Sequence, residues 1–295
     1  MNYGNKRVEA IYQSILSLLL LLFTFTMIYP FLNIFAKSLS TGTAMIGKTV
    51  GLIPIQPTLK NYQIIFHDPL LTRALLVTIA RTFAGSALHI IVVGAAAYGC
   101  SKKHLKGRMF IVIFFMIPMY FSGGLLPNYI LIKNLHLMNN FLVYILPGMF
   151  NTFNFLVMMT YFRQLPESIE ESAKIDGASD FHIFTRIVIP VSTPIIATIL
   201  LFVAVGQWNS WFDAILYVNK AKLQPVQAVL QNIISGSQEL LQNAQWGTKR
   251  ASAVTYTTQS ITMATLCFTV FPILLVYPFL QKYFVKGIMI GSVKG

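Results

Sequence analysis

Apolar residues in this sequence are gathered into six long runs, which polar and charged residues separate. A helix needs about 20 predominantly apolar residues to cross the hydrocarbon core of a bilayer, and each run reaches that length. The pattern therefore predicts an all-α polytopic membrane protein with six transmembrane helices. The predicted spans lie at about residues 11–36, 73–100, 109–132, 141–162, 191–212 and 260–284.

The third run is the least regular of the six. Its interruptions are Pro118, Gly123, Gly124 and Pro127. Proline and glycine both weaken a helix interior, and in a membrane the freed backbone groups need protein or water as partners. We expect the outer end of this span to be kinked or unwound. Residues 37–72, rich in glycine and proline, are expected to be irregular, and residues 214–259 form a long polar outer segment.

The distribution of charge mainly predicts how the chain is oriented in the membrane. The chain is 55% hydrophobic with a mean hydropathy of +0.65, which excludes an ordinary soluble domain. Its net charge of +13 is explained by basic loops on the cytoplasmic side, so no nucleic-acid partner is expected. Four basic residues fall within residues 101–108. They predict that this turn and both termini lie in the cytoplasm.

The most polar long segment is 163–194, which holds five of the nine acidic residues. Pro166 can begin a helix because its missing N–H costs nothing in the first turn, and three glutamates there favour the positive end of the helix dipole. Gly177 supplies a C-terminal stop, and Ser179 or Asp180 can cap a second short helix. The segment therefore predicts two short helices joined at an elbow, on the same side as the basic turn.

The spacing of this segment resembles the EAA loop of binding-protein-dependent ABC importers. In that loop Glu-Ala-Ala is followed after three residues by Gly and after nine more by Ile-x-Leu-Pro. The matching positions are Glu171, Ser172, Ala173, Gly177, Ile187, Ile189 and Pro190. Two of them depart from the consensus, Ser172 from alanine and Ile189 from leucine, and both changes are small.

Other stretches resemble the carbohydrate-uptake, maltose-type branch of these permeases. They are residues 57–62, Ala97-Tyr98 with Ser101-Lys102, the sequence around Asp176 and Pro194, and the tail 291–295. The similarity covers nearly the whole chain. It implies the type I ABC importer permease fold, with residues 1–72 as a first helix and outer segment, 73–285 as a core with coupling helices at 166–190, and 286–295 as a cytoplasmic tail.

The resemblance also implies roles for particular residues. Residues of the loop would couple the permease to the ATPase, namely Glu170, Glu171, Ser172, Ala173, Asp176, Gly177, Ala178, Ile187 and Pro190. Residues of the tail would reach the ATPase interface, namely Gly291, Val293, Lys294 and Gly295.

The implied assembly lies in the bacterial inner membrane. Its partners would be a second, homologous permease in a heterodimer, an ATPase dimer, an extracytoplasmic solute-binding protein, an oligosaccharide and membrane lipid. This chain would form half of the translocation pathway and bind no cofactor, because ATP and Mg²⁺ belong to the partner ATPase.

Residues 42–49 satisfy the Walker A pattern, yet we do not interpret them as a phosphate-binding loop. The mechanism needs a strand before the loop and a helix after it, so that backbone N–H groups cradle phosphate. Here a membrane span precedes the run, and Gly51, Pro54 and Pro57 follow it. The predicted topology also places the run outside the cell, away from ATP.

Few polar residues lie within the spans, and these are the candidates for the transport pathway. Arg81 would line a cavity or contact a partner, although it could also extend to the outer interface. His89 is expected to be a packing residue. Asn151 and Asn154, three apart on one helix face, fit either a sugar pathway or hydrogen bonds between helices.

The end of the fifth span is rich in aromatic and amide side chains. They could stack on and bind sugar, or they could form an aromatic belt at the membrane surface. We favour the pathway for Gln207 and Asn209, keep Trp208 as a candidate, and favour the belt for Trp211.

Two other functions remain as alternatives. An ion-coupled carrier needs intramembrane carboxylates or broken helices for its coupling ion, and no acidic residue falls inside a predicted span. A membrane enzyme needs a nucleophile, a metal cluster or paired acids near a span end, and none is found. Basic residues on the outer side suggest an acidic oligosaccharide or an acidic binding protein: Lys37, Lys48, Lys60, Arg73, Lys220, Lys222, Lys249 and Arg250.

Overall fold

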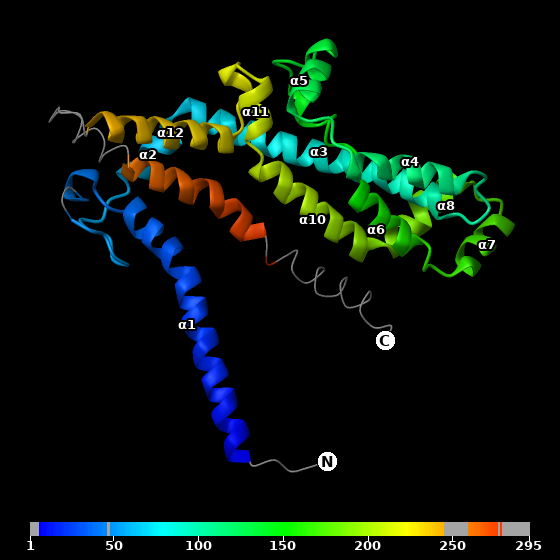
Figure 1. Cartoon of the computed structure of the whole chain (residues 1–295), viewed down its shortest axis with the longest axis horizontal. Coiled ribbons are helices and arrows are strands. Elements are labelled where there is room, and N and C mark those ends of the chain that lie inside the picture. The colour runs from blue at the N-terminus through cyan, green and yellow to red at the C-terminus, as the bar shows by residue number, and fades with distance from the viewer. Residues whose placement is uncertain (1–5, 46–47, 245–258, 277, 279–295) are drawn as a thin grey trace. The chain divides into compact units, whose positions relative to one another are not determined.

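The computed structural model describes residues 6–45, 48–244, 259–276 and 278. In this part of the chain the secondary structure is helical, and the one extended pairing is an isolated bridge between Ser40 and Pro57. The chain packs as two compact units, whose elements can be found by residue number from the colours of Figure 1. Unit 1 combines residues 1–69 with 230–271, and unit 2 combines 70–229 with 272–295.

Unit 1 begins with the long apolar helix α1 (Lys6–Ser38). No residue in its most hydrophobic stretch is buried within the chain, so its surroundings must be lipid or another protein. The 3-10 turn η1 (Gly42–Met45) and the short helix α2 (Lys60–His67) follow. The expectation of an irregular stretch at 37–72 was therefore wrong for α2, which forms because Asn61 and Ile65, four residues apart, share one buried face.

Asn61 fixes this part of unit 1 through its side-chain amide. Its Nδ2 donates to the carbonyls of Ser38 at 2.8 Å and Ser40 at 3.1 Å. The hydroxyl of Ser260, from the helix at 259–276, donates to its Oδ1 at 3.3 Å. The helix α12 (Val226–Ala244) begins in unit 2 and continues in unit 1.

The Walker-like run lies between α1 and α2. A helix, not a strand, precedes it, and residues 48–59 that follow form no helix. Among the residues that the structure describes there, the strand–loop–helix arrangement that holds phosphate is therefore not formed.

The first helix of unit 2 is α3 (Pro69–Ser101), a continuous helix of 33 residues whose first residue is counted in unit 1. The interrupted third span forms α4 (Arg108–Tyr120) and α5 (Leu125–Asn134), which meet at 115°. Gly124 has a φ of +79° at the break, a conformation that costs other residues a Cβ clash. The predicted kink is confirmed.

The fourth span was expected to be one helix at 141–162, and that was wrong. The structure has a 3-10 turn, η2 (Phe141–Tyr144), and then α6 (Thr152–Phe162), with irregular backbone between them. Pro147 and Gly148 fall in this gap, and proline removes a helical hydrogen bond while glycine adds backbone freedom.

The remaining helices of unit 2 follow in order. They are α7 (Glu167–Ile175), α8 (Asp180–Ile183), the π-helical turn η3 (Phe184–Val188), α9 (Ile189–Val191), α10 (Thr193–Asn209), α11 (Phe212–Tyr217) and η4 (Ala221–Leu223). In the described residues, three helices are long and apolar enough to cross a membrane, and two bent pairs raise the number to five. The shorter α6 is also apolar, so every predicted run contains a hydrophobic helix. The chain is an all-α polytopic membrane protein.

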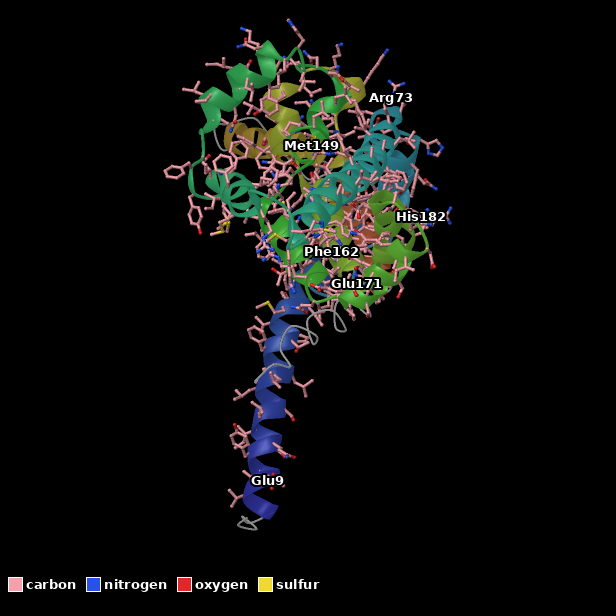
Figure 2. All side chains as sticks on the ribbon, turned by 90° about the vertical axis from the view of Figure 1, so that its right-hand side faces the viewer. Glu9, Arg73, Met149, Phe162, Glu171 and His182 are labelled. Atoms are coloured by element: carbon pink, nitrogen blue, oxygen red, sulfur yellow. The ribbon has the colours of Figure 1, made fainter. Side chains whose placement is uncertain are left out.

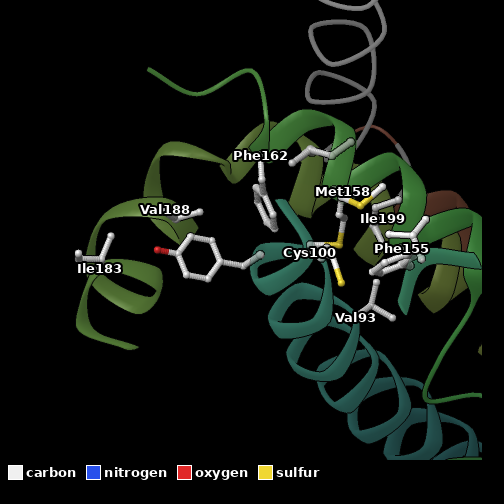
Figure 3. Close-up of a cluster of buried hydrophobic side chains, with 13 residues drawn as sticks. Val93, Cys100, Phe155, Met158, Phe162, Ile183, Val188 and Ile199 are labelled. Carbon is white, nitrogen blue, oxygen red and sulfur yellow. The ribbon is translucent and has the colours of Figure 1, made fainter. Parts of the chain in front are cut away.

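The largest core of unit 2 lies where α3, α6, the α8–η3 segment and α10 meet, as Figure 3 shows. Val93, Phe155, Met158, Ile183 and Ile199 are fully buried there. Because residues from both sides of the polar segment enter this core, the segment is attached to the helices and does not hang free.

Candidate functional site

The polar segment folds as the sequence predicts, into two short helices with a sharp elbow. α7 begins at Glu167, one residue after Pro166, which stands at the N-cap. Gly177 has a φ of +79°. Its N–H donates to Lys174 O at 3.0 Å, and Ala178 N–H donates to Ala173 O at 2.9 Å. This pair of bonds is a Schellman motif, which closes the helix and fixes the direction of the following chain.

The second short helix is capped as expected. The hydroxyl of Ser179 accepts from the backbone N–H of His182 at 3.3 Å, which satisfies one free N–H of the first turn. Lys174 and Asp180 form an ion pair across the elbow at 3.3 Å. The helix then continues through the π-turn, which contains Ile187 and is followed by α9 with Pro190.

Two large apolar side chains lie on the surface of this polar elbow. Ile175 is 87% exposed and Phe181 is 76% exposed. Glu171, on α7, is exposed as well, and Figure 2 labels it together with His182 of α8. Two large apolar side chains this exposed on a polar segment favour a surface that binds another protein. The coupling residues predicted from the sequence did not include Ile175 and Phe181, although large apolar residues within the most polar segment could have indicated a binding surface.

Two acids of α7 pair with the basic turn that follows α3. Glu170 pairs with Lys102, and Glu167 pairs with Lys103 at 2.7 Å. The hydrogen bond from Lys103 lowers the pKa of Glu167 below its ordinary value. Glu171 has no ion-pair partner among the described residues, so its carboxylate is available to another chain.

The second candidate site is a cavity of about 1080 Å³ within unit 2. Four of the predicted pathway residues line it: Arg81, Asn151, Asn154 and Gln207. Tyr144 and Asp213 also line it, and sequence analysis did not assign either of them to Arg81. A buried arginine requires an acidic partner, and Asp213 stands at the end of the fifth span. The pairing of Arg81 with Asp213 could therefore have been predicted from the sequence.

Every N–H of the Arg81 guanidinium has an acceptor within the chain. Nη2 donates to Asp213 Oδ2 at 2.5 Å, and Nη1 donates to Asp213 Oδ1 and the Ser210 carbonyl at 3.3 Å each. Nε and Nη2 donate to Gln207 Oε1 at 3.2 and 3.1 Å. Arg81 is only 1% exposed and its guanidinium carbon lies 4.3 Å from the centre of the Tyr144 ring. It is therefore a buried partner of Asp213 and does not extend to the interface.

The amide of Gln207 is held at both ends. Oε1 accepts from Arg81, while Nε2 donates to Tyr144 O at 3.2 Å. Two glycines leave space for the Gln207 amide. A Cβ on Gly85 would lie 2.7 Å from Nε2, and a Cβ on Gly148 would lie 3.5 Å from it. The cluster of Arg81, Gln207, Asp213 and Tyr144 thus joins α3, the α10–α11 corner and η2.

Asn154 forms a hydrogen bond between helices, which is one of the two roles that its sequence position allowed. Its Nδ2 lies 2.9 Å from His89 Nε2, and His89 Nδ1 lies 3.0 Å from the Gly148 carbonyl. His89 is a buried packing residue, as expected. Asn151 does not share a helix face with Asn154, because it is the N-cap of α6 and accepts from Asn154 N–H at 3.1 Å.

Two pathway candidates do not line this cavity. Trp208 lines a separate apolar pocket with residues that include Leu201, Val205 and Ile273. Neighbouring residues of a helix point about 100° apart, so Trp208 cannot face the same way as Gln207. Asn209, the last residue of α10, is exposed and accepts from Gln227 at 3.5 Å.

The predicted ATPase-interface tail, Gly291, Val293, Lys294 and Gly295, lies outside the described residues.

A polytopic helical fold, an exposed elbow between spans and a cavity among the helices define a membrane subunit of a transport system. Residues 107–290 match the family described as the binding-protein-dependent transport system inner membrane component, and the chain belongs to this family. The predicted resemblance to ABC importer permeases is confirmed, and the architecture is that of a type I importer permease.

Individual relatives cover nearly the whole chain. It is 39% identical over 282 residues to the polygalacturonan/rhamnogalacturonan transport system permease protein YtcP of Bacillus subtilis (strain 168), covering 94% of this chain and 96% of that one. It is 40% identical over 268 residues to protein LplC of the same organism, covering 91% and 90%. A solved chain from a bacterial ABC transporter that imports the acidic polysaccharide alginate is 29% identical, with a TM-score of 0.84, covering 96% of this chain and 100% of that chain.

Proposed function

We propose that this chain is the permease subunit of an ATP-driven importer of oligosaccharides released from uronate-containing polysaccharides. The observation that carries the proposal is the rigid elbow of α7 and α8, which presents Glu171, Ile175 and Phe181 to a partner. The names of two relatives, which mention polygalacturonan and alginate, support the substrate class.

The elbow is the proposed contact with a separate ATPase subunit. Its Schellman motif holds the two helices at a fixed angle, so that a movement of the ATPase is passed on and not absorbed. Glu171 is proposed to pair with a basic residue of the ATPase. ATP and Mg²⁺ would bind to that partner, and this chain would have no catalytic site.

The cavity of unit 2 is the proposed contribution of this chain to the pathway, with a homologous permease forming the other half. Among the described residues that line it, Arg81 and Asp213 are the two formally charged ones, and they neutralise each other. The cavity therefore offers a sugar hydrogen bonds and aromatic faces but no unpaired cation. We propose that the acidic groups of the substrate are selected by the extracytoplasmic binding protein and not by this wall.

The orientation follows from the same assignment. The elbow and the basic turn at 101–108 would face the cytoplasm, and both termini would lie there too, in a bacterial inner membrane.

Uptake and ATP hydrolysis by the complete transporter in proteoliposomes test the proposal. Glu171→Lys should abolish uptake while the mutant chain still assembles, and Lys48→Ala should change neither activity, because the Walker-like run binds no nucleotide. Normal uptake by Glu171→Lys would refute the coupling role. Uptake driven by an ion gradient without ATP would instead establish an ion-coupled carrier.

A second measurement tests the substrate. The binding protein should bind oligogalacturonides more tightly than neutral oligosaccharides of equal length. Equal affinity for both would refute the proposed uronate class.

A further inference from the structure

Two parallel ion pairs join the same two segments, the end of α3 with its following turn and the first turn of α7. The side chains of Lys102 and Glu170 are 16% and 18% exposed, whereas those of Lys103 and Glu167 are 82% and 66% exposed. Burial strengthens an ion pair's contribution to geometry, because water no longer competes for either charge, and an exposed pair contributes little. The chain therefore carries one inner contact and, beside it, a matched outer one.

Lys102 is also held by an aromatic ring. Its Nζ lies 3.9 Å from the centre of the Tyr98 ring, within the range of a cation–π interaction. Tyr98 is itself 7% exposed. Tyr98 lies in the last turn of α3 and Lys102 directly follows that helix, so the cation contacts both the Tyr98 ring and the Glu170 carboxylate.

The same ring reaches the second short helix. Tyr98 stacks on Phe184, at the start of the π-turn after α8, with ring centres 5.0 Å apart and planes 28° apart. It meets Phe162, at the end of α6, edge to face at 6.4 Å and 80°. In Figure 3, Phe162, Ile183 and Val188 surround the end of α3 on this side. The end of α3 thus holds α7 by charge and the α8 segment by packing.

We infer that the Lys102–Glu170 pair, which we term the α3 anchor, positions the elbow on α3, and that Glu170 acts within this chain while Glu171 alone faces the ATPase. The inference rests on the proposed coupling role of the elbow. α3 runs without a break from the anchor to Arg81 in the cavity wall. A displacement of the elbow is thereby delivered to the helix that carries the cavity's charged cluster.

Reversible cross-linking of the complete transporter tests the α3 anchor. The background is Cys100→Ala and Cys267→Ala, which removes both native cysteines. Lys102→Cys with Glu170→Cys should lower substrate-stimulated ATP hydrolysis and uptake about tenfold, the size expected when a largely desolvated ion pair is lost. A short bis-methanethiosulfonate linker should restore both activities, and dithiothreitol should remove them again.

The outer pair provides the control. Lys103→Cys with Glu167→Cys should lose less than about twofold before and after linking. Glu170→Gln, which keeps the shape of the side chain, should reproduce the loss without cross-linking, so the test does not depend on the double variant folding.

Two results would overturn the inference. Full activity of both Glu170→Gln and the unlinked 102/170 variant would show that the anchor is dispensable. Inhibition by the linker would show that the contact must open during transport. If Glu171→Lys also retained full uptake, the coupling role of the elbow itself would fail; a loss confined to Glu171→Lys would refute the anchor alone.

Discussion

The Arg81–Asp213 pair gives a specific energetic prediction, because replacing one partner should destabilise the protein more than replacing the other. Arg81 is 1% exposed and Asp213 is 23% exposed. Asp213→Asn leaves the guanidinium buried without a counter-charge, and breaking a buried pair in this way costs about 3–5 kcal/mol. Since Asp213 is partly exposed and asparagine can still accept one hydrogen bond, we expect a value of about 3 kcal/mol.

The reverse substitution should cost less. In Arg81→Met the carboxylate of Asp213 keeps hydrogen bonds from the Ser210 hydroxyl and from its neighbour's backbone N–H, each at 2.9 Å. It also keeps its contact with solvent. We expect a loss of about 1–2 kcal/mol, from the hydrogen bonds that Gln207 and the Ser210 carbonyl no longer receive. The double variant should be more stable than Asp213→Asn alone, because it buries no unpaired charge.

The assay is thermal denaturation of the purified transporter in detergent. The fraction of tagged permease that still elutes with the complex after heating gives an apparent melting temperature for each variant. The expected order of melting temperatures is the parent highest, then Arg81→Met with the double variant close to it, and Asp213→Asn lowest, at roughly 6 °C or more below the parent. Melting of Asp213→Asn at or above the temperature of Arg81→Met would refute the reasoning that Arg81 is a buried charge neutralised by Asp213.

Three further predictions concern glycine and pH. Gly177→Val should abolish uptake at normal membrane abundance, because a β-branched residue at a φ of +79° costs about 1–2 kcal/mol and opens the elbow; normal uptake would contradict a rigid elbow. Gly85→Val should destabilise the transporter in the same heating assay, because even its Cβ would lie 2.7 Å from the Gln207 amide, whereas Gly85→Val in a Gln207→Ala background should recover part of the loss. Lys103 lowers the pKa of Glu167, so their ion pair stabilises the fold above the ordinary glutamate pKa of 4.5, and this stabilisation is lost as the pH falls through the lowered pKa. Glu167→Gln should therefore make the stability less sensitive to acid below pH 4.5. A pH profile identical to that of the parent would contradict the ion pair.

Local signals were sufficient for the elbow. The stop at Gly177 and the cap at Ser179 depend on hydrogen bonds between residues at most five positions apart, so the identities of neighbouring residues decide them. The kink of the third span was readable for the same reason. The helix boundary at Glu167, one residue after the expected start, shows the usual limit of such signals.

The six apolar runs by themselves determined that the protein is a helical membrane protein, because a bilayer admits few other structures. They did not determine which polar residues meet. Arg81 and Asp213 stand 132 positions apart, and nothing local to either residue selects the other. The rotation of α10 likewise decided that Gln207 faces the cavity and Trp208 a different pocket. The packing of α7 on the end of α3 decided that Glu170 pairs with Lys102 while Glu171 is exposed. Neighbouring residues of a helix point about 100° apart, so the two glutamates cannot face the same way.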